Sequence, residues 1–531
     1  MTKPAIKARK SAALSPSGIA TNRTASDADL GSSESPVRKK LRSTHEGSPY
    51  LLSHLPFSTS TPSNIFGVGS QHPFSNYWTC AGGIPEIIGV LPSKDQADIL
   101  VAKYMEVVDP VYPCIHRRTF YTDYEHFWAS SPAKKNEASA DLLALHYTIY
   151  ALGTQFMPLA SCQERRSSSE FYASASNQAL QIFSYLNRAS LRALAAMTLL
   201  TYFLMNDNHA SDAYAFSGIL LRQAYAMRLH RDPDIATPDC SEVEKQVRRK
   251  MWQAVFFQDT FLTVLLKLPP NATHSDVQPD SLVDEVTLRE QGHDVSSPYT
   301  INSGTRVENL MSISVIAPPQ DTLPPPKIPA HLVDPAVDRQ DVDYIRSMWK
   351  LGNLVQENLS SRLSLSLPLV SSSRQKTSII SSFRAFYRAL PTSLTTLDPQ
   401  LLAQQALTNS RAVHQNLFLT SNFYHCLMIL QVSENEETGV ECNVRGTLEA
   451  AHEAIWAFFK LHRMFENESG VWWVFQHRAF EEAVSLTCPV CHCSASAHGF
   501  PLLLLKSTLH CLPGEDDYRR LCAELLTDNT S

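Results

Sequence analysis

From Pro92 onward, apolar residues recur at spacings of three and four, the period of an amphipathic helix. Ser93 and Gln96 form a capping-box pattern in front of the first such run, and the pair Asp109-Pro110 predicts its end. No strand-like alternation rises above this background. The pattern therefore predicts an all-α fold, with further helices over residues 119–128, 139–154, 165–185, 190–206, 210–229 and 241–268.

A proline-rich stretch interrupts the helical pattern. Residues 268–335 hold 11 of the chain's 32 prolines, and proline removes a backbone donor that a helix interior needs. Helical spacing resumes afterwards and predicts helices over 338–355, 401–432, 447–464 and 472–480, with weaker segments at 501–512 and 516–526. We therefore expect one helical domain in two parts, 91–267 and 336–531, joined by an irregular connector over 268–335.

Residues 1–90 are expected to form a disordered basic tail, because Ser, Thr and Pro dominate the first 76 residues. Residues 1–50 carry nine Lys/Arg against four Asp/Glu, a net charge of +5. The whole chain has a net charge of −6, so the remaining 481 residues carry a net charge of −11. Pro36 precedes a short run of cations, Arg38, Lys39, Lys40 and Arg42. Such a run fits the groove of a nuclear import receptor, and the alternative is a solvated cationic tail.

Motifs of enzyme chemistry do not appear in the sequence. Only 18 of 531 residues are glycine, which disfavours loops that bring the backbone close to a phosphate. His452-Glu453 begins a zincin-like pattern, but Trp456 occupies the position of the second histidine. We therefore expect no catalytic residues and no enzyme; a site dispersed along the chain is the distant alternative.

The 11 cysteines, an odd number without a secretory leader, predict reduced thiols in an intracellular compartment. No run of 18 apolar residues exists, so we expect no membrane partner. Cys488, Cys491 and Cys493 include a Cys-x-x-Cys spacing that could grip zinc. A second ligand pair at suitable spacing is lacking, which favours burial of these thiols in a core over a metal site.

A basic run near the start of the 241–268 helix could be taken for a DNA-reading surface. Glu244 lies four residues before Arg248, a spacing that stabilises the helix itself. Beyond Trp252 the helix is apolar on nearly every side. These features predict a core helix with its cations along an exposed end.

Three motifs in this order resemble the fungal-specific transcription factor domain, the helical middle homology region of fungal zinc-cluster regulators. They cover residues 109–120, 218–233 and 244–259. The matching positions are Pro113, His116, Arg117, Phe120, Gly218, His230, Arg231, Asp232, Pro233, Glu244, Arg248, Arg249, Trp252 and Asp259. We interpret them as structural: residues 229–233 would end one helix, and Asp232 would pair with Arg248 or Arg249 on the next.

The sequence also departs from that family. Family members usually carry six spaced cysteines, which bind two zinc ions, before the helical domain; here no cysteine precedes Cys80. Residues 266–269 read Leu-Lys-Leu-Pro where the family commonly has "lGrP". Either an upstream exon supplies the cluster, or the protein reaches DNA through a partner transcription factor; zinc would be a cofactor only in those ways.

The resemblance implies a nuclear regulator of fungal pathway genes, such as a secondary-metabolite gene cluster. Its implied partners are DNA, directly or through a partner factor, the nuclear import receptor and the transcription machinery. The alternative from another class is a helical scaffold or co-regulator that binds no DNA itself.

Overall fold

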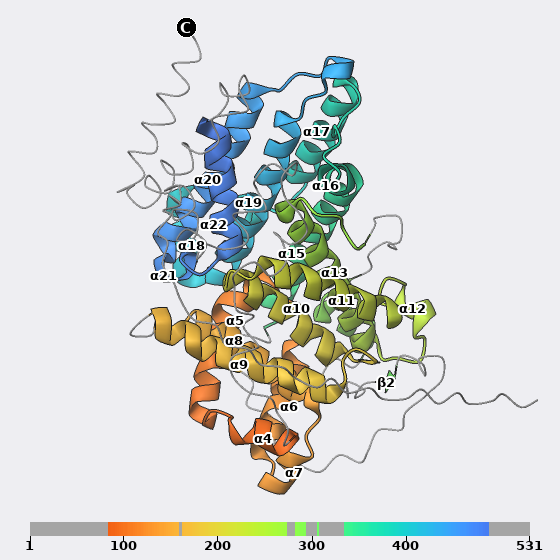
Figure 1. Ribbon diagram of the computed structural model, residues 1–531, viewed down its shortest axis with the longest axis vertical. Coiled ribbons are helices and arrows are strands. Elements are labelled where there is room, and N and C mark those ends of the chain that lie inside the picture. Colours follow the sequence, from red (N-terminus) through yellow and green to blue (C-terminus); the bar gives the residue numbers. More distant parts are fainter. Residues whose placement is uncertain (1–82, 159–161, 273–281, 294–304, 307–333, 488–531) are drawn as a thin grey trace, which may run out of the picture. The chain divides into compact units, whose positions relative to one another are not determined.

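The computed structural model describes residues 83–158, 162–272, 282–293, 305–306 and 334–487, and helices dominate this part of the chain (Figure 1). The predicted all-α class is confirmed. The helices up to residue 290 are α4 (Ile84–Gly89), α5 (Lys94–Val111), α6 (Arg117–Ala129), α7 (Pro132–Asn136), α8 (Ala140–Gln155), α9 (Cys162–Phe183), α10 (Leu191–Asn206), α11 (Ala210–Ala226), α12 (Pro233–Ala236), α13 (Glu242–Leu266) and α14 (Glu285–Glu290).

The helices from residue 335 onward form the second part of the described chain. They are α15 (Pro335–Val355), the π-helical turn η5 (Gln356–Ser360), α16 (Ser361–Ser364), α17 (Ser373–Arg388), η6 (Thr392–Leu394), α18 (Pro399–Thr408), α19 (Ser410–Val432), η7 (Glu436–Thr438), α20 (Val444–Met464), α21 (Glu466–Ser469) and α22 (Trp473–Thr487). Two short strands, β1 (Arg188–Ala189) and β2 (Thr305–Arg306), pair antiparallel. The sequence pattern did not predict this pairing.

Side-chain caps fix where the main helices begin. Ser93 accepts a hydrogen bond from the backbone N–H of Gln96 at 3.3 Å, and the Gln96 side chain accepts one from the Ser93 N–H at 3.2 Å. The predicted capping box before α5 is thus confirmed. Ser241 accepts from the Glu244 N–H at 3.2 Å before α13, but the reciprocal bond is not made there.

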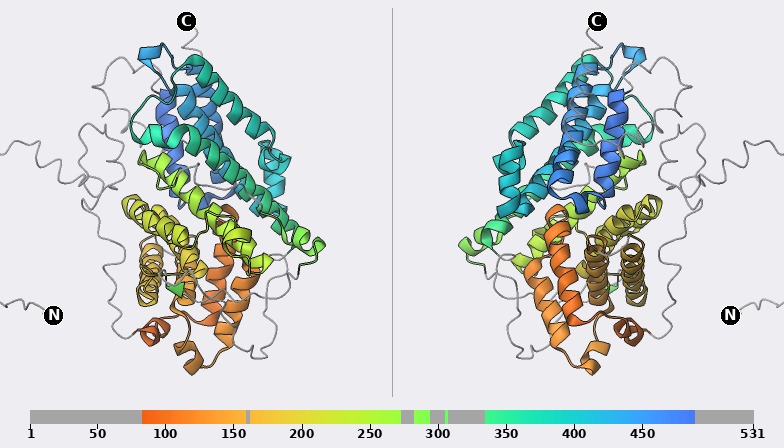
Figure 2. Two further views of the ribbon diagram at one scale, coloured as in Figure 1. Left: turned by 90° about the vertical axis from the view of Figure 1, so that its right-hand side faces the viewer. Right: turned by 90° about the vertical axis from the view of Figure 1, so that its left-hand side faces the viewer.

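The core consists of helices that are buried on most of their surface. Every residue of α10 from Leu191 to Met205 is buried, and so is α13 from Val255 to Leu266. The predicted core helix is therefore confirmed. Helix α8 packs against α5, α9 and α10, while α13 packs against α10, α11 and α15. Figure 2 shows α13 and α15 crossing between the first helices and the later ones.

Contacts between the two parts of the chain are extensive. Helix α5 packs against α19, and α15 packs against both α13 and α19. Hydrophobic residues from both parts belong to one continuous cluster of buried side chains. Elements on either side of residues 268–335 therefore share a core. The exact limits of the predicted domain parts stay a prediction.

Several predicted helix boundaries were wrong. Pro110 does not stop α5, which continues to Val111, because a proline in the last turn disturbs few backbone hydrogen bonds. The predicted 401–432 helix is two helices, since Asn409 caps α19 through its side chain. Helix α11 ends at Ala226, and Arg228 follows with a positive φ of 57°.

Helix α17 was missed altogether. Only Lys376, Ile379 and Phe383 are buried on it, so the apolar stripe is narrow. Ile379, Phe383 and Phe386 nevertheless follow the spacing of a helix, so the sequence held a signal for α17 that was overlooked. Ser372 begins this helix by accepting a hydrogen bond from the Gln375 N–H at 3.2 Å.

Candidate functional site

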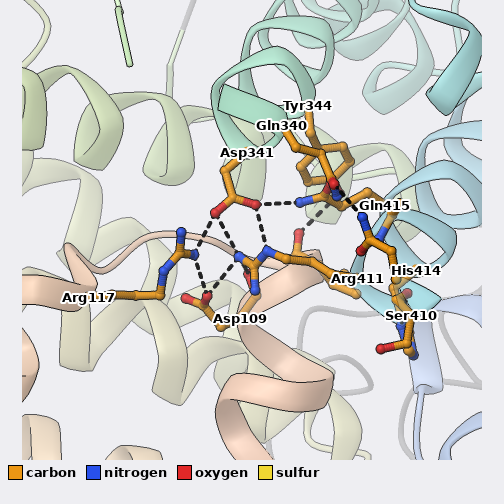
Figure 3. A network of polar contacts seen from close by, with 12 residues as sticks. Asp109, Arg117, Gln340, Asp341, Tyr344, Ser410, Arg411, His414 and Gln415 are labelled. Carbon is orange, nitrogen blue, oxygen red and sulfur yellow. Dashed lines mark hydrogen bonds and ion pairs between the residues drawn. The ribbon is translucent and has the colours of Figure 1, made fainter. Parts of the chain in front are cut away.

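A buried cluster of two carboxylates and two guanidinium groups lies where four helices meet (Figure 3). Asp109 and Asp341 are fully buried, and Arg117 and Arg411 are less than a tenth exposed. Arg117 Nη1 lies 3.0 Å from Asp109 Oδ2 and 2.5 Å from Asp341 Oδ2. The opposite charges balance, which is what a charge group removed from water requires.

Arg411 forms ion pairs with both carboxylates. Its Nε and Nη2 atoms donate to the two oxygens of Asp341 at 2.7 and 2.8 Å, a bidentate arrangement. The same Nη2 lies 2.8 Å from Asp109 Oδ2. Gln415 Nε2 adds a bond to Asp341 Oδ1 at 2.7 Å. Burial alone would raise the pKa of Asp341, but Arg411 and Arg117 outweigh burial and hold that pKa well below its ordinary value.

Each member of this cluster comes from a different helix. Asp109 lies near the end of α5, and Arg117 is the first residue of α6. Asp341 lies on α15 and Arg411 on α19. Arg117 was singled out from the sequence and Asp109 opens the first motif, whereas Asp341 and Arg411 stand in no local motif. The cluster therefore fixes the crossing of four helices.

A second cluster lies beside the first. His116 Nε2 is 3.3 Å and Arg118 Nη2 is 3.0 Å from the carboxylate of Glu285, the first residue of α14. Burial would raise the pKa of Glu285, but His116 and Arg118 lower it to about 2. The Glu285 N–H donates to Asp338 Oδ2 at 2.7 Å. Helices α6, α14 and α15 are thereby tied together.

His116 also caps helix α6. Its Nδ1 accepts a hydrogen bond from the Thr119 N–H at 3.3 Å and lies 2.8 Å from the Thr119 hydroxyl. Phe120 is buried among aromatic rings, with Tyr121 and Tyr124 at centroid distances of 5.4 and 5.7 Å. Pro113 is buried next to Cys114. These positions of the first motif build structure.

The second motif joins α12 to α13. Arg249 Nη2 lies 2.9 Å from Asp232 Oδ1 and 2.7 Å from Asp234 Oδ2, so the pairing expected for Asp232 is confirmed through Arg249. Pro233 does not end a helix as predicted; it opens α12, with Asp232 as its cap. Pro233 suits the first helical turn because the missing N–H has no helical acceptor there.

The remaining positions of the second motif differ in environment. His230 lies between the rings of Tyr225 and Trp252, at centroid distances of 5.0 and 5.9 Å. Gly218 faces the Asn271 side chain, which a Cβ at this position would meet at 3.6 Å. Arg231 is exposed at the surface.

The third motif contradicts one prediction. Its cations were expected along an exposed end of α13, yet Arg249 is buried and Lys250 Nζ donates to the Ile115 carbonyl at 3.1 Å. Arg248 pairs with Glu244 at 3.2 Å, as the four-residue spacing predicted. These cationic side chains pack against the protein surface, because neighbouring segments supply carboxylate and carbonyl acceptors for them.

Asp259 holds the turn that follows α13. It is buried, and it accepts hydrogen bonds from the backbone N–H groups of Asn271 and Ala272, each at 2.9 Å. The Asn271 side chain donates to it as well, at 2.8 Å. Burial raises the pKa of Asp259. The role of this residue is to satisfy backbone donors.

Two cysteines of the described part of the chain are buried in the core. Burial raises the pKa values of the Cys114 and Cys426 thiols to about 12, which keeps both protonated. No group of three or more His, Cys, Asp or Glu among the described residues could hold a metal ion. Cys488, Cys491 and Cys493 lie outside the described residues, as do the import-like residues Arg38, Lys39, Lys40 and Arg42 and the predicted segments 501–512 and 516–526.

Comparison with known proteins agrees with the three motifs. Residues 101–318 match the model of the fungal specific transcription factor domain. This part of the chain is therefore similar to that domain. All three motifs, residues 109–120, 218–233 and 244–259, lie inside the matched region.

Relatives of the chain are named as transcription factors. The Zn(2)-C6 fungal-type transcription factor mpsB of Macrophomina phaseolina is 28% identical over 211 residues, 38% of this chain and 27% of the relative. Transcription factor opdR of Penicillium oxalicum is 27% identical over 206 residues, 38% and 25% of the two chains, and yanR of Aspergillus niger is 25% identical over 202 residues, 35% and 25%. The match thus spans about a quarter of each relative. No solved structure matches the chain.

The ion cluster joins the matched domain to helices beyond it. Asp109 and Arg117 lie within residues 101–318, whereas Asp341 and Arg411 come from helices that the domain match does not reach. Tyr344 repeats this link through its hydroxyl, which donates to the Val111 carbonyl at 3.0 Å. The matched region and helices α15 and α19 are therefore packed as one structural unit.

A small cavity lies next to this junction. It has a volume of about 40 Å³ and lies between the 111–114 segment, α10, α13 and α15. Its lining residues include Tyr112, Tyr202, Lys250, Phe257, Tyr344 and Trp349.

No described helix is both long and apolar enough to span a bilayer.

Proposed function

We propose that this protein regulates transcription of fungal pathway genes in the nucleus, with its helical domain as a regulatory and protein-contact platform. The domain match and the relatives named as transcription factors support this proposal. The pathway, for which a secondary-metabolite gene cluster is the first candidate, follows from the family resemblance alone.

The proposed mechanism rests on the contacts that the cations of the basic run on α13 make within the protein. Arg248, Arg249 and Lys250 are engaged by Glu244, by the Asp232/Asp234 pair and by the Ile115 carbonyl. Phosphate contacts to DNA need cations that can release counterions and face the duplex. We therefore propose that the helical domain does not read DNA through this run. DNA contact would come from outside the described domain, through a partner factor or a zinc cluster encoded upstream.

The proposal also holds that the protein is not an enzyme. Burial keeps Cys114 and Cys426 as thiols, and the motif histidines serve as a helix cap and as a packed ring. A pathway regulator needs no nucleophile. A purified protein that converts a small molecule would contradict this part of the proposal.

Localisation tests the nuclear step with a matched control. The full chain fused to a fluorescent protein should accumulate in the nucleus, with import supplied by the run at residues 38–42. Replacing Arg38, Lys39, Lys40 and Arg42 by alanine should leave the fusion in the cytosol. Replacing Lys3, Lys7, Arg9 and Lys10 removes the same charge from the same tail and should leave it nuclear. Cytosolic wild-type fluorescence in every growth state would favour a helical scaffold instead.

Gene control is tested by occupancy and expression. Chromatin immunoprecipitation of the tagged chain should recover a limited set of promoters, and deletion of the gene should change transcripts of the genes they drive. Repeating the immunoprecipitation in strains that lack single candidate partners shows which partner brings the chain to DNA. An unchanged transcript profile under inducing conditions would overturn the regulatory proposal.

A further inference from the structure

Residues 283–293, which contain α14 and which we call the strap, are attached outside the main core. Among the described residues, the main cluster of buried apolar side chains includes Leu282 but no side chain of the strap. Leu288 instead forms a small separate cluster with Val243 of α13, and the half-buried Val283 packs against it. The apolar attachment of the strap is therefore small. A segment with few buried apolar contacts opens locally more easily than a core helix.

Ion pairs supply much of the remaining attachment. Glu285 Oε1 lies 3.3 Å from His116 Nε2, and Glu285 Oε2 lies 3.0 Å from Arg118 Nη2. Asp284 Oδ2 lies 3.6 Å from Arg339 Nε on α15. All five side chains are partly exposed, between 12% and 59%, so dissolved salt weakens their attraction.

Two backbone donors of the strap bind side chains of other elements. The Val283 N–H donates to Gln246 Oε1 on α13 at 3.0 Å, and the Glu285 N–H donates to Asp338 Oδ2 on α15 at 2.7 Å. Both bonds must break when the strap leaves, even if α14 stays helical. The amides of Val283 and Glu285 therefore report whether the strap is bound.

The surface under the strap combines two cations with an apolar side chain. We call it the strap seat; it consists of His116, Arg118, Val243, Gln246 and Asp338. The strap fills it with a carboxylate at Glu285 and a leucine three positions later, at Leu288. Residues three apart on a helix lie on one face, so one short helical segment presents both groups together.

We propose that the strap detaches as a unit, hinged at Leu282, and that its seat then binds a segment of a partner protein with the same pattern. That segment carries an acidic residue and, three positions later, a leucine. The strap is thus a built-in competitor, and a partner binds only the fraction of molecules in which the strap is open. The inference rests on the proposed function, since the partner would be a protein that the regulatory platform contacts.

Hydrogen exchange in the purified full chain, resolved to single amides, tests detachment. We expect the Val283 and Glu285 amides to exchange at least about 100-fold faster than those of α13 from Val255 to Leu266, because opening of the strap leaves the core intact. Raising the NaCl concentration from about 0.1 M to about 1 M should accelerate only the strap amides, by about threefold. Equal rates in the strap and α13 would overturn detachment.

Two substitutions on α14 test the ion pairs. Glu285→Gln removes the carboxylate that faces His116 and Arg118, and it should accelerate exchange of the Val283 amide about tenfold. Glu290→Gln removes the same charge at an exposed position of the same helix and should change this rate less than about twofold. Equal effects of the two variants would show that the ion pairs do not hold the strap.

A labelled peptide of residues 282–293 is the probe for docking, and fluorescence anisotropy measures its binding. The full chain with Glu285→Gln and Leu288→Ala has a weakened strap, so its seat should bind the peptide with a dissociation constant of about 0.1 mM. The wild-type chain should bind it at least about tenfold more weakly, because its own strap occupies the seat. A peptide with the same two substitutions is the control and should not bind.

A third substitution in the double variant locates the binding site. Arg118→Met should weaken peptide binding about tenfold, whereas Arg222→Met, at an exposed position of α11, should leave it unchanged. No binding to the double variant, equal binding to the wild type, or binding that survives Arg118→Met would overturn the docking site. None of these results touches the localisation and promoter experiments, which test the proposed function separately.

Discussion

Arg411 Nη2 lies 2.8 Å from Asp109 Oδ2, although 302 positions separate these residues along the chain. The bond connects α19 to the end of α5, and both side chains are buried. A charge pair of this kind adds little net stability over an apolar pair of the same shape. We infer that its value lies in specificity, because any other packing of α19 against the domain would leave two buried aspartates with the single guanidinium of Arg117.

Removal of Arg411 should therefore be costly. In Arg411→Met the apolar stem remains, but Asp109 and Asp341 must share the single guanidinium of Arg117. We expect the free energy of unfolding to fall by about 3–5 kcal/mol, the range for breaking a buried ion pair. Urea denaturation followed by circular dichroism measures this loss.

The control for that variant is Arg445→Met on α20. Arg445 pairs with Glu449 at 2.9 Å, but its side chain is 89% exposed, so the change should cost less than about 0.5 kcal/mol. A loss below about 1 kcal/mol in Arg411→Met would show that the cluster does not hold α19 in place.

Asp232→Ala tests the pair that the motif predicted. Arg249 would keep Asp234 as a partner, since the two lie 2.7 Å apart, so the loss should be moderate. Helix α12 would also lose its cap. We expect a decrease of about 1–2 kcal/mol in the free energy of unfolding, seen as a lower melting temperature. An unchanged melting temperature would refute the structural role of this motif.

His146 should make the protein sensitive to mild acid. Its ring is fully buried, with Tyr124 and Phe127 both at centroid distances of 5.4 Å, and neither nitrogen has a hydrogen-bond partner among the described residues. Burial lowers the pKa of His146 from 6.5 to about 3. Between these values the unfolded chain binds a proton that the folded protein does not, so stability is lost as pH falls below 6.5.

The size of this effect can be measured with His146→Phe. The variant should lose about 2 kcal/mol less than the wild type between pH 7 and pH 5. His126→Phe, at an exposed position of α6, is the matched control, and the difference between the two pH profiles isolates the buried ring. Parallel profiles for wild type and His146→Phe would contradict the assignment of a neutral buried imidazole.

Local patterns explain how much of this structure the sequence revealed. The capping box at Ser93 and the apolar run of α13 depend on residues within one helix, and both were predicted correctly. The Asp232–Arg249 pair was also within reach, because adjacent helices of a known motif carry it.

The missing parts depend on contacts between distant segments. Asp341 and Arg411 stand in no motif, and only the packing of α15 and α19 against α5 brings them to Asp109. The hydrogen bond of Lys250 was missed for the same reason, since its acceptor is the carbonyl of Ile115, 135 positions away. Spacing along one helix contains no information about such partners.

Lys267 offers a change that should stabilise the protein. It ends α13 in the left-handed conformation, with φ of 55°, and its N–H bonds back to Thr263 and Val264. Glycine is preferred at this position of a helix end because it has no Cβ to clash, and the family pattern "lGrP" places glycine here. We expect Lys267→Gly to raise the free energy of unfolding by about 0.5–1 kcal/mol. The substitution also removes an ion pair, because Lys267 Nζ lies 3.4 Å from Glu481 Oε1. The lysine side chain is 40% exposed, so this loss offsets only a few tenths of a kcal/mol of the gain. Lys350→Gly, the same substitution inside α15, should instead lower the free energy of unfolding by about 1 kcal/mol. A loss of stability in both variants would show that the left-handed backbone at Lys267 carries no strain.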